Sequence, residues 1–422
     1  MTNPVYVADL QLDEPLVELR VPPSYRSARL LVRLHGAPLG DVVVPLDSGV
    51  VEAGLLAKTV WGELGDRISA HLAEDGEPAI GELPEAGLLG SSVCRRRLPA
   101  PDSQPTITVV VATRDRTESL LRCLESVAAL RYDRFDVVVV DSAPSNTASA
   151  EAVAAVAAEW SVPLRYVCSP MPGLAIAHNV ALAAVTGQLV AFTDDDVLVD
   201  PDWLLETAAG FAEAEVFCVT GLIVPAELET RAQCLVEEFA GFGRGYVARA
   251  FDPLDPPDDP LFPFTAGRFG SGANMTYRTA WLRERGGFDA ALGAGTLARG
   301  GDDLAAFARV VRDGGVLRYE PAAIVRHFHR RDYPSLQRQA YGYGVGLGAY
   351  LMSAMRHEPA AVPYMLRRAV PALRHLLSSA SVKNSPRSRT FPRELVWRER
   401  LGVLVGPIAY LRSVLRLRRS GH

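Results

Sequence analysis

The chain has 422 residues, of which 48% are apolar and 22% are charged. This length exceeds that of one ordinary core and predicts two or three domains, and the composition excludes a disordered chain. The longest apolar run, LGVLVGPIAYL at 401–411, is shorter than the ~18 residues of a membrane-spanning helix. Residues 1–15 contain no basic segment followed by an apolar one, so we expect no secretion signal.

The cysteines predict the cellular compartment. Five of them are scattered along the chain, with no CxxC pair. This pattern argues against a disulfide framework or a zinc site and favours a reducing compartment. We therefore expect a cytoplasmic protein.

The net charge of −5 is unevenly distributed. Residues 356–422 hold 14 Lys and Arg against three acids, a balance of +11, whereas the preceding 355 residues have a balance of −16. A basic end on an acidic body predicts a polyanionic partner, either lipid headgroups or nucleic acid. Past residue 380 only Phe391, Trp397 and Tyr410 are available to stack on bases, so no nucleic acid is expected. We expect peripheral contact with the anionic inner face of the cell membrane, or packing of this end on the acidic body.

Residues 1–100 predict a small β-rich domain. Two apolar runs, 27–34 and 41–46, flank a glycine-containing turn, which indicates a hairpin, and an amphipathic helix is expected near 53–74. We find no chemistry in this segment. Residues 94–105, with their prolines and charges, are typical of a linker.

A different pattern begins at Ile107. Short apolar runs alternate with helical stretches, and the runs lie at 107–112, 136–140, 164–168 and 189–194. Fully apolar strands that alternate with helices predict a doubly wound, mostly parallel α/β sheet covered on both faces. Asp115 and Glu118 fit a capping box at the start of the first of these helices. Residues 336–422 are expected to form a basic helical C-terminal region. Its glycine-rich run at 341–350 indicates either aromatic stacking or close helix packing.

Polar groups follow three of the predicted strands. They are Thr113-Arg114-Asp115, Asp141 and Asp194–Asp196, and ligands bind at this edge of a parallel sheet. Neighbouring acids repel one another unless a cation or a donor-rich ligand neutralises them, and oxygen ligands near a phosphate suit Mg²⁺ or Mn²⁺. The alternative for Asp194–Asp196 is a solvated acidic turn that caps the next helix.

Seven motifs between residues 105 and 345 together resemble a known family. In chain order they are ATRDR, VVVVDS, GLAIAHN, FTDDD, GGFD, GGDDL and VRHFH. Their order and spacing are similar to those of glycosyltransferase family 2, which has the GT-A fold and would here occupy residues 105–335. The resemblance implies an inverting, metal-dependent glycosyltransferase of hexosyltransferase type. The Gln-x-x-Arg-Trp motif of processive synthases is not present, which favours single transfer.

The resemblance also implies roles for individual residues in binding the donor. Thr113, Arg114 and Asp115 line the nucleotide pocket, and Asp141 accepts the N3–H of a uracil-like or thymine-like base, which favours a UDP- or dTDP-sugar. His178 and Asn179 lie near the diphosphate, where the family often has Arg-Asn, so a permanent positive charge is missing there.

The remaining implied roles involve Asp194–Asp196, which correspond to the family's DxD metal site, and Asp302-Asp303 of the GGDDL motif. Asp194 and Asp195 contact the donor, while Asp194, Asp196 and His327 hold Mn²⁺ or Mg²⁺. Asp303 is the general base, and Asp302 replaces the family's Glu beside it. The acceptor would be a hydroxyl of a glycan, a lipid-linked molecule or a small molecule, in cell-envelope or secondary-metabolite glycosylation.

Other interpretations are open for the same residues. Asp302 and Asp303 also fit the N-terminus of a helix, where acids offset the helix dipole. His327 and His329 lie on one face of a strand and fit surface histidines bound to water. Alternative functions are a sugar-phosphate nucleotidylyltransferase, although ATRDR contains no glycine to bind phosphate, and a non-catalytic membrane- or nucleic-acid-binding protein.

Overall fold

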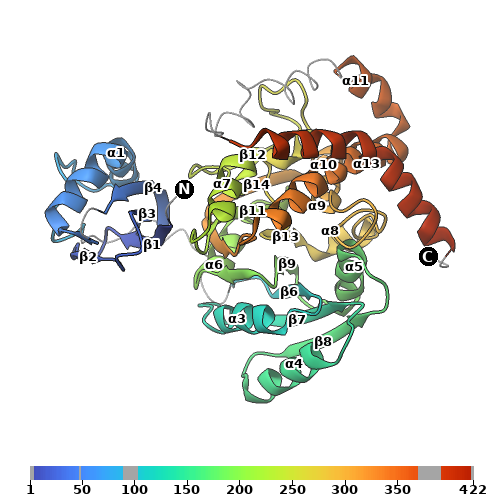
Figure 1. Cartoon of the computed structure of the whole chain (residues 1–422), viewed down its shortest axis with the longest axis horizontal. Helices are drawn as coiled ribbons and strands as arrows, with labels where there is room; N and C mark the ends of the chain where they lie inside the picture. Colours follow the sequence, from blue (N-terminus) through green and yellow to red (C-terminus); the bar gives the residue numbers. More distant parts are fainter. Residues whose placement is uncertain (1–3, 47–48, 89–102, 369–390, 420–422) are drawn as a thin grey trace.

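The computed structural model describes residues 4–46, 49–88, 103–368 and 391–419. Within these residues, one large sheet has the strand order β10-β14-β11-β13-β9-β6-β7-β8, and β12 pairs with β14 (Figure 1). Its strands are β6 (Ile107–Thr113), β7 (Phe135–Ser142), β8 (Leu164–Ser169), β9 (Leu189–Asp194), β10 (Val197–Val199), β11 (Val216–Pro225), β12 (Arg249–Phe251), β13 (Met275–Arg278) and β14 (Val316–His327). Strands β6 to β9 are parallel, as is β11 with β14, while β10, β12 and β13 run against their neighbours.

The apolar strands form this sheet because both of its faces are buried. All seven residues of β6 are buried, and successive residues enter two different cores, Val110 on one face and Val109 and Val111 on the other. The first core includes residues of α5 (Leu174–Ala184), α8 (Thr279–Glu284) and α9 (Asp302–Arg312). The second includes residues of α3 (Thr117–Ala128), α4 (Ala148–Glu159) and α6 (Trp203–Ala209). The predicted fold class, a mostly parallel α/β sheet with helices on both faces, is confirmed.

The predicted capping box is wrong. The residue that precedes α3 is Arg116, and no side chain caps this helix. Asp115 has a left-handed backbone with φ of 53°, and its carboxylate accepts hydrogen bonds from the backbone N–H and the hydroxyl of Ser145. The Asp115 carboxylate therefore binds Ser145 in the loop after β7 instead of capping α3 as the sequence predicts.

The N-terminal residues up to 88, here called the N-terminal module, form a separate small sheet. Its strands are β1 (Val5–Gln11), β3 (Ser27–Leu34) and β4 (Ala37–Pro45), with β2 (Leu19–Arg20) paired to β5 (Val50–Val51). The predicted hairpin is confirmed as β3 and β4, and the predicted helix as α1 (Ala53–Glu74). Most of the predicted linker lies outside the described residues, and the domain boundaries stay predictions.

The C-terminal helices form a close pair. α10 (Tyr333–His357) and α13 (Arg393–Arg419) lie side by side (Figure 1). A Cβ atom added at Gly344 or Gly348 would collide with the backbone of α13, and one at Gly402 or Gly406 with that of α10. The glycine-rich run therefore serves helix packing, the second of the two interpretations. The remaining helical segments are α7 (Arg231–Ala240), η2 (Ala266–Arg268), η3 (Pro359–Ala361) and α11 (Val362–Arg367).

A buried ion pair joins the N-terminal module to the large sheet. Arg33 of β3 donates to Asp200 over 2.6 Å, and both side chains are nearly inaccessible to solvent. Leu31 packs beside Arg33 against Leu222 and Ile324 of the large sheet. Removal of either partner would leave the other buried with only a longer ion pair, Asp200 with Arg326 at 3.7 Å or Arg33 with Asp9 at 3.4 Å.

We expect Arg33→Met to lower the free energy of unfolding by about 3 kcal/mol, because the Asp200 carboxylate would stay buried without its main partner. Urea denaturation measures this loss. The control is Arg131→Met, which removes an exposed pair with Asp202 and should cost less than about 1 kcal/mol. Equal losses in both variants would contradict a special role for Arg33.

Candidate active site

Polar residues meet at the carboxyl edge of the large sheet, as the sequence predicts. β6 lies between β7 and β9, and their register pairs Thr113 with Asp141 and Ala112 with Asp194. A cavity of about 1730 Å³ opens over this edge. Eight of the predicted site residues line it, namely Thr113, Arg114, His178, Asp194, Asp196, Asp302, Asp303 and His327.

Asp194, Asp196 and His327 form a group that could hold a metal ion. One ligand atom from each lies within 4.8 Å of the others. The group is brought together because β10 follows the acidic turn and pairs with β14, placing Val197 opposite His327. Asp196 and His327 are 7% and 8% exposed, so the alternative of a solvated turn is wrong. Two carboxylates and one imidazole fit Mn²⁺ or Mg²⁺.

Arg116 neutralises this acidic turn and was not found from the sequence. Its guanidinium donates to Asp196 over 2.8 Å and to Asp195 over 3.1 Å. The Thr113 hydroxyl also donates to Asp195 over 2.7 Å. Asp195 therefore points toward Thr113 and Arg116, and only its two neighbours face the candidate metal position. The signal in the sequence was the second arginine of ATRDR, which is two residues beyond Arg114.

Burial and the neighbouring charges shift the pKa values of Asp194 and Asp196 in opposite directions. Burial, with the charges of Asp196 and Asp195, raises the pKa of Asp194 to about 8. Burial also acts to raise the pKa of Asp196, but the neighbouring His327, Arg116 and Arg330 outweigh it and the pKa is lowered. Burial lowers the pKa of His327 to about 4, so its ring is neutral at pH 7 and can act as a ligand.

A line of hydrogen bonds runs from His327 to the N-terminal module. The Nδ1 atoms of His327 and His329 are 3.0 Å apart, and His329 Nε2 lies 2.9 Å from Glu237. A carboxylate only accepts, so His329 donates from Nε2 to Glu237, and the tautomer that carries this single proton accepts at Nδ1. His327 then donates from Nδ1, which leaves the lone pair of its Nε2 directed to the Asp196 side, 3.5 Å away. Arg29 of β3 donates to the other oxygen of Glu237 over 2.7 Å.

The burial and contacts of His327 and His329 exclude the interpretation that they are surface histidines bound to water. His327 and His329 are 8% and 3% exposed, and Glu237 and Arg29 orient them from α7 and β3. Neither Glu237 nor Arg29 was found from the sequence, because they lie about 90 and 300 residues from the histidines and join them only in the fold. Both also line the cavity.

Asp302 and Asp303 begin α9 on another side of the cavity. Gly301, with φ of 86°, precedes them, and no side chain caps the helix. Asp303 accepts hydrogen bonds from the backbone N–H groups of Gly272 and Leu304. Burial raises the pKa of both carboxyl groups, that of Asp302 to about 7 with a contribution from the Asp303 charge. Asp302 is buried and Asp303 only half-buried, so Asp303 is the more accessible of the two.

Four predicted residues are not among the described residues that line the cavity, namely Asp115, Asp141, Asn179 and Asp195. Asp141 is buried, accepts from the Tyr166 hydroxyl over 3.1 Å, and has no partner for its other oxygen. Burial raises its pKa. Asn179 is occupied structurally, because its amide exchanges two hydrogen bonds with the backbone of Phe288.

His178 lines the cavity without a charge. Its ring centroid lies 4.7 Å from that of Phe192 and 5.3 Å from that of Phe288. Burial lowers its pKa to about 3, and neither ring nitrogen has a partner. The positive charge of the cavity comes instead from arginines, which are Arg29, Arg114, Arg116, Arg244, Arg249, Arg268, Arg299, Arg330, Arg338 and Arg368. These guanidinium groups suit an anionic ligand such as a diphosphate.

The comparison with protein families agrees with this site. Residues 108–285 match the family described as Glycosyl transferase family 2. The chain therefore contains a segment of glycosyltransferase family 2 type.

Two curated relatives are similar in sequence. The Pre-mycofactocin glycosyltransferase of Mycobacterium tuberculosis is 29% identical over 282 residues, which cover 66% of this chain and 54% of the relative. The chain thus spans about half the length of that protein. The Succinoglycan biosynthesis protein ExoM of Rhizobium meliloti is 35% identical over 122 residues, which cover 28% of this chain and 39% of ExoM.

Solved structures show weaker similarity. A mannosyltransferase from Pyrobaculum calidifontis, solved with GDP-Man and Mn²⁺, has 18% identity and a TM-score of 0.45, covering 76% of this chain and 77% of that one. S. aureus TarS 1-349 with UDP-GlcNAc has 15% identity and a TM-score of 0.41, covering 71% and 91%. Both scores lie below 0.5, so the similarity to family 2 rests on the sequence matches. Within the described residues, no helix has the length and apolar character to cross a bilayer.

The raised pKa values predict how stability depends on pH when no metal is bound. Asp194 and Asp302, with pKa values of about 8 and about 7, keep their protons in the folded chain and lose them on unfolding. The unfolded state therefore binds fewer protons, and stability falls as pH rises. The low pKa values of His178 and His327 oppose this trend only in part, because the unfolded histidines are about half protonated at pH 6.5 and largely neutral above about pH 7.5.

We expect the free energy of unfolding in EDTA to fall between pH 6.5 and 8, by on the order of 1 kcal/mol per pH unit. Urea denaturation at several pH values measures it. Asp302→Asn should reduce the slope, because the amide does not titrate. A stability that rises over this interval, or an unchanged slope in the variant, would contradict the burial of these charges.

Proposed function

We propose that this chain is an inverting, metal-dependent glycosyltransferase that transfers one sugar from a nucleotide-diphosphate donor to an acceptor hydroxyl. One observation carries the proposal. The same cavity is lined by two separate clusters of carboxylates. One consists of Asp194 and Asp196 with His327, and the other of Asp302 and Asp303 at the start of α9. A transferase of this kind needs one group to hold the leaving diphosphate and another to activate the acceptor.

The chain's own residues divide the reaction between them. Asp303 takes the proton of the acceptor hydroxyl, whose oxygen forms a bond to the anomeric carbon as the bond from that carbon to the diphosphate breaks. Asp302, raised in pKa by burial and by Asp303, carries a proton near neutral pH and leaves Asp303 as the accessible base. A Mn²⁺ or Mg²⁺ ion on Asp194, Asp196 and His327 would supply charge stabilisation for the diphosphate. Arg116 and Arg330 supply fixed positive charge beside it.

The donor that we favour is a UDP- or dTDP-sugar. Asp141 keeps one carboxylate oxygen without a partner at the sheet edge, next to Ser142, which lines the cavity. That oxygen would accept the N3–H of a uracil or thymine base. For the acceptor, the relative of M. tuberculosis makes pre-mycofactocin the first molecule to test, before glycans and lipid-linked hydroxyls.

The base assignment is tested by Asp303→Asn. We expect transfer to fall by at least ~100-fold while donor affinity stays within a few-fold, because the base acts on the acceptor and not on the donor. The rate is measured with UDP- and dTDP-sugars, and donor affinity by calorimetry. The control, Asp313→Asn, removes a carboxylate at the other end of the same helix, where it pairs with Arg285. A parallel loss of donor binding would instead assign Asp303 to the donor.

We also propose that α13 holds this cytoplasmic enzyme on an anionic membrane surface. One face of the helix packs on α10, and the opposite face exposes Trp397, Leu401, Leu404, Ile408, Leu411 and Leu415. Their spacing of three or four residues places them in one apolar ridge. Arg412, Arg416, Arg418 and Arg419 are exposed near its end. Such a helix lies in the membrane interface with its arginines at the headgroups. Packing on the body and membrane contact thus use different faces.

Sedimentation with phosphatidylglycerol vesicles tests the ridge. We expect the full chain to sediment with vesicles at low salt and to be released at high salt, since each engaged arginine contributes about 1 kcal/mol before screening. Changing both Leu404 and Ile408 to Asp should leave the protein in the supernatant. Leu254→Asp, at a residue that is 91% exposed elsewhere, is the control. Wild-type protein that stays in the supernatant would assign α13 to structure alone.

A further inference from the structure

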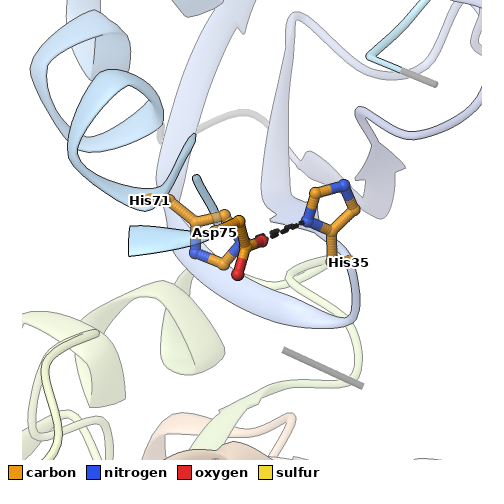
Figure 2. Close-up of side chains that lie close together, drawn as sticks. All are labelled: His35, His71 and Asp75. Atoms are coloured by element: carbon orange, nitrogen blue, oxygen red, sulfur yellow. Dashed lines mark hydrogen bonds and ion pairs between the residues drawn. The ribbon is translucent and has the colours of Figure 1, made fainter. Parts of the chain in front are cut away.

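Three ligand-type side chains meet inside the N-terminal module, remote in sequence from the transferase site. His35 lies in the turn between β3 and β4, His71 in the last turn of α1, and Asp75 directly after that helix. Figure 2 shows the three side chains directed toward one another. The spacing of four residues brings His71 and Asp75 to one side of the helix end, and the β3–β4 turn places His35 opposite them.

The separations of the facing atoms are those of metal ligands. His35 Nδ1 is 2.8 Å from Asp75 Oδ2, and His71 Nε2 lies 3.4 Å from each of these two atoms. A zinc ion binds nitrogen and oxygen at about 2.0–2.2 Å in tetrahedral geometry, which separates neighbouring ligand atoms by roughly 3.3 Å. A point about 2 Å from all three atoms therefore exists with little movement of the side chains.

The burial of the three side chains favours a bound metal ion. The side chains of His35, His71 and Asp75 are only 2%, 10% and 0% exposed. A carboxylate without solvent is costly unless opposite charge lies close to it. A divalent ion between the three side chains supplies that charge, whereas the alternative is a proton shared between His35 and Asp75.

We propose that His35, His71 and Asp75 form a structural site for a divalent transition metal, with zinc preferred. Two imidazoles and one carboxylate suit zinc, while the two carboxylates and one imidazole at Asp194 suit Mn²⁺ or Mg²⁺. The His71 side chain is the most exposed of the three, so a fourth ligand such as water would enter from its side. The cysteine pattern argued against zinc in this chain, and this site uses no cysteine.

The site would stabilise the contact between the N-terminal module and the large sheet. Arg33, two residues before His35, pairs with Asp200 and also donates to the carbonyl of Gly36 in the same turn. A metal that fixes His35 to the end of α1 therefore fixes the turn on which this ion pair depends. A small module with a limited core gains folding free energy from such a cross-link.

Metal content of the full chain tests the proposal. The Asp196→Asn variant serves as the background, because it weakens the other candidate metal group. After treatment with EDTA, the protein is dialysed against Zn²⁺ with excess Mg²⁺, and bound zinc is measured by mass spectrometry. We expect about one zinc per chain on this background, and more than ~10-fold weaker zinc binding when His71→Ala or Asp75→Asn is added. Glu74→Gln, at an exposed acid beside the site, should retain the zinc.

Two further measurements keep the test decisive if a variant folds poorly. Cobalt in place of zinc should give the strong visible absorption of a four-coordinate ion, and Zn²⁺ should raise the melting temperature of the Asp196→Asn protein relative to EDTA. No bound zinc and no shift in melting temperature in that protein would overturn the proposal whatever the variants do. Equal zinc content with and without His71→Ala would also overturn it, and the three residues would then be a hydrogen-bonded cluster only.

Discussion

The structure depends on how three consecutive acids are accommodated at the end of a fully buried strand. Asp194 is the last residue of β9, Asp195 and Asp196 follow it directly, and these last two are almost inaccessible to solvent. Burial of adjacent carboxylates is tolerable only where positive charge and hydrogen-bond donors surround them. Arg116 and Thr113 satisfy Asp195, whereas Asp194 and Asp196 face His327. Burial and the charges of Asp196 and Asp195 raise the pKa of Asp194, because the nearby cations of the protein do not fully compensate its carboxylate.

Much of the large sheet could be predicted from local sequence. The apolar runs of β6, β7 and β9 are largely buried, so their composition alone indicates parallel strands of a covered sheet. The position of the acids follows from where those runs end. The motif resemblance then grouped residues of α9 and β14 with them. Eight of the predicted site residues line the cavity for this reason.

What could not be predicted depends on contacts between distant segments. Glu237 and Arg29 reach the site from α7 and β3, and no periodicity or spacing links them to it. Arg116 lies within the ATRDR motif, but its contact with the acids after β9 forms only in the fold. The capping box failed because a left-handed backbone at Asp115 redirected the carboxylate to Ser145. His178 appeared to leave the site without charge, but the arginines that supply it come from several elements of the folded chain.

The N-terminal module and the C-terminal helices both adjoin the catalytic cavity. The module contributes Arg29 to its wall and orients the His327 side through Glu237, and α10 contributes Tyr343 and Gly346. α13 is held against α10 by glycines, which leaves its apolar ridge exposed. A segment that the sequence suggested was without chemistry is therefore part of the site's support.

The most direct test of the central claim is a calorimetric titration of Mn²⁺ into the wild-type chain and into Asp196→Ala. The account predicts one Mn²⁺ site at the acidic turn, with affinity lowered by at least ~10-fold in the variant and transfer nearly abolished, while circular dichroism shows an intact fold. Equal Mn²⁺ affinity and wild-type turnover in the variant would contradict it, because the acids after β9 would then not hold the metal.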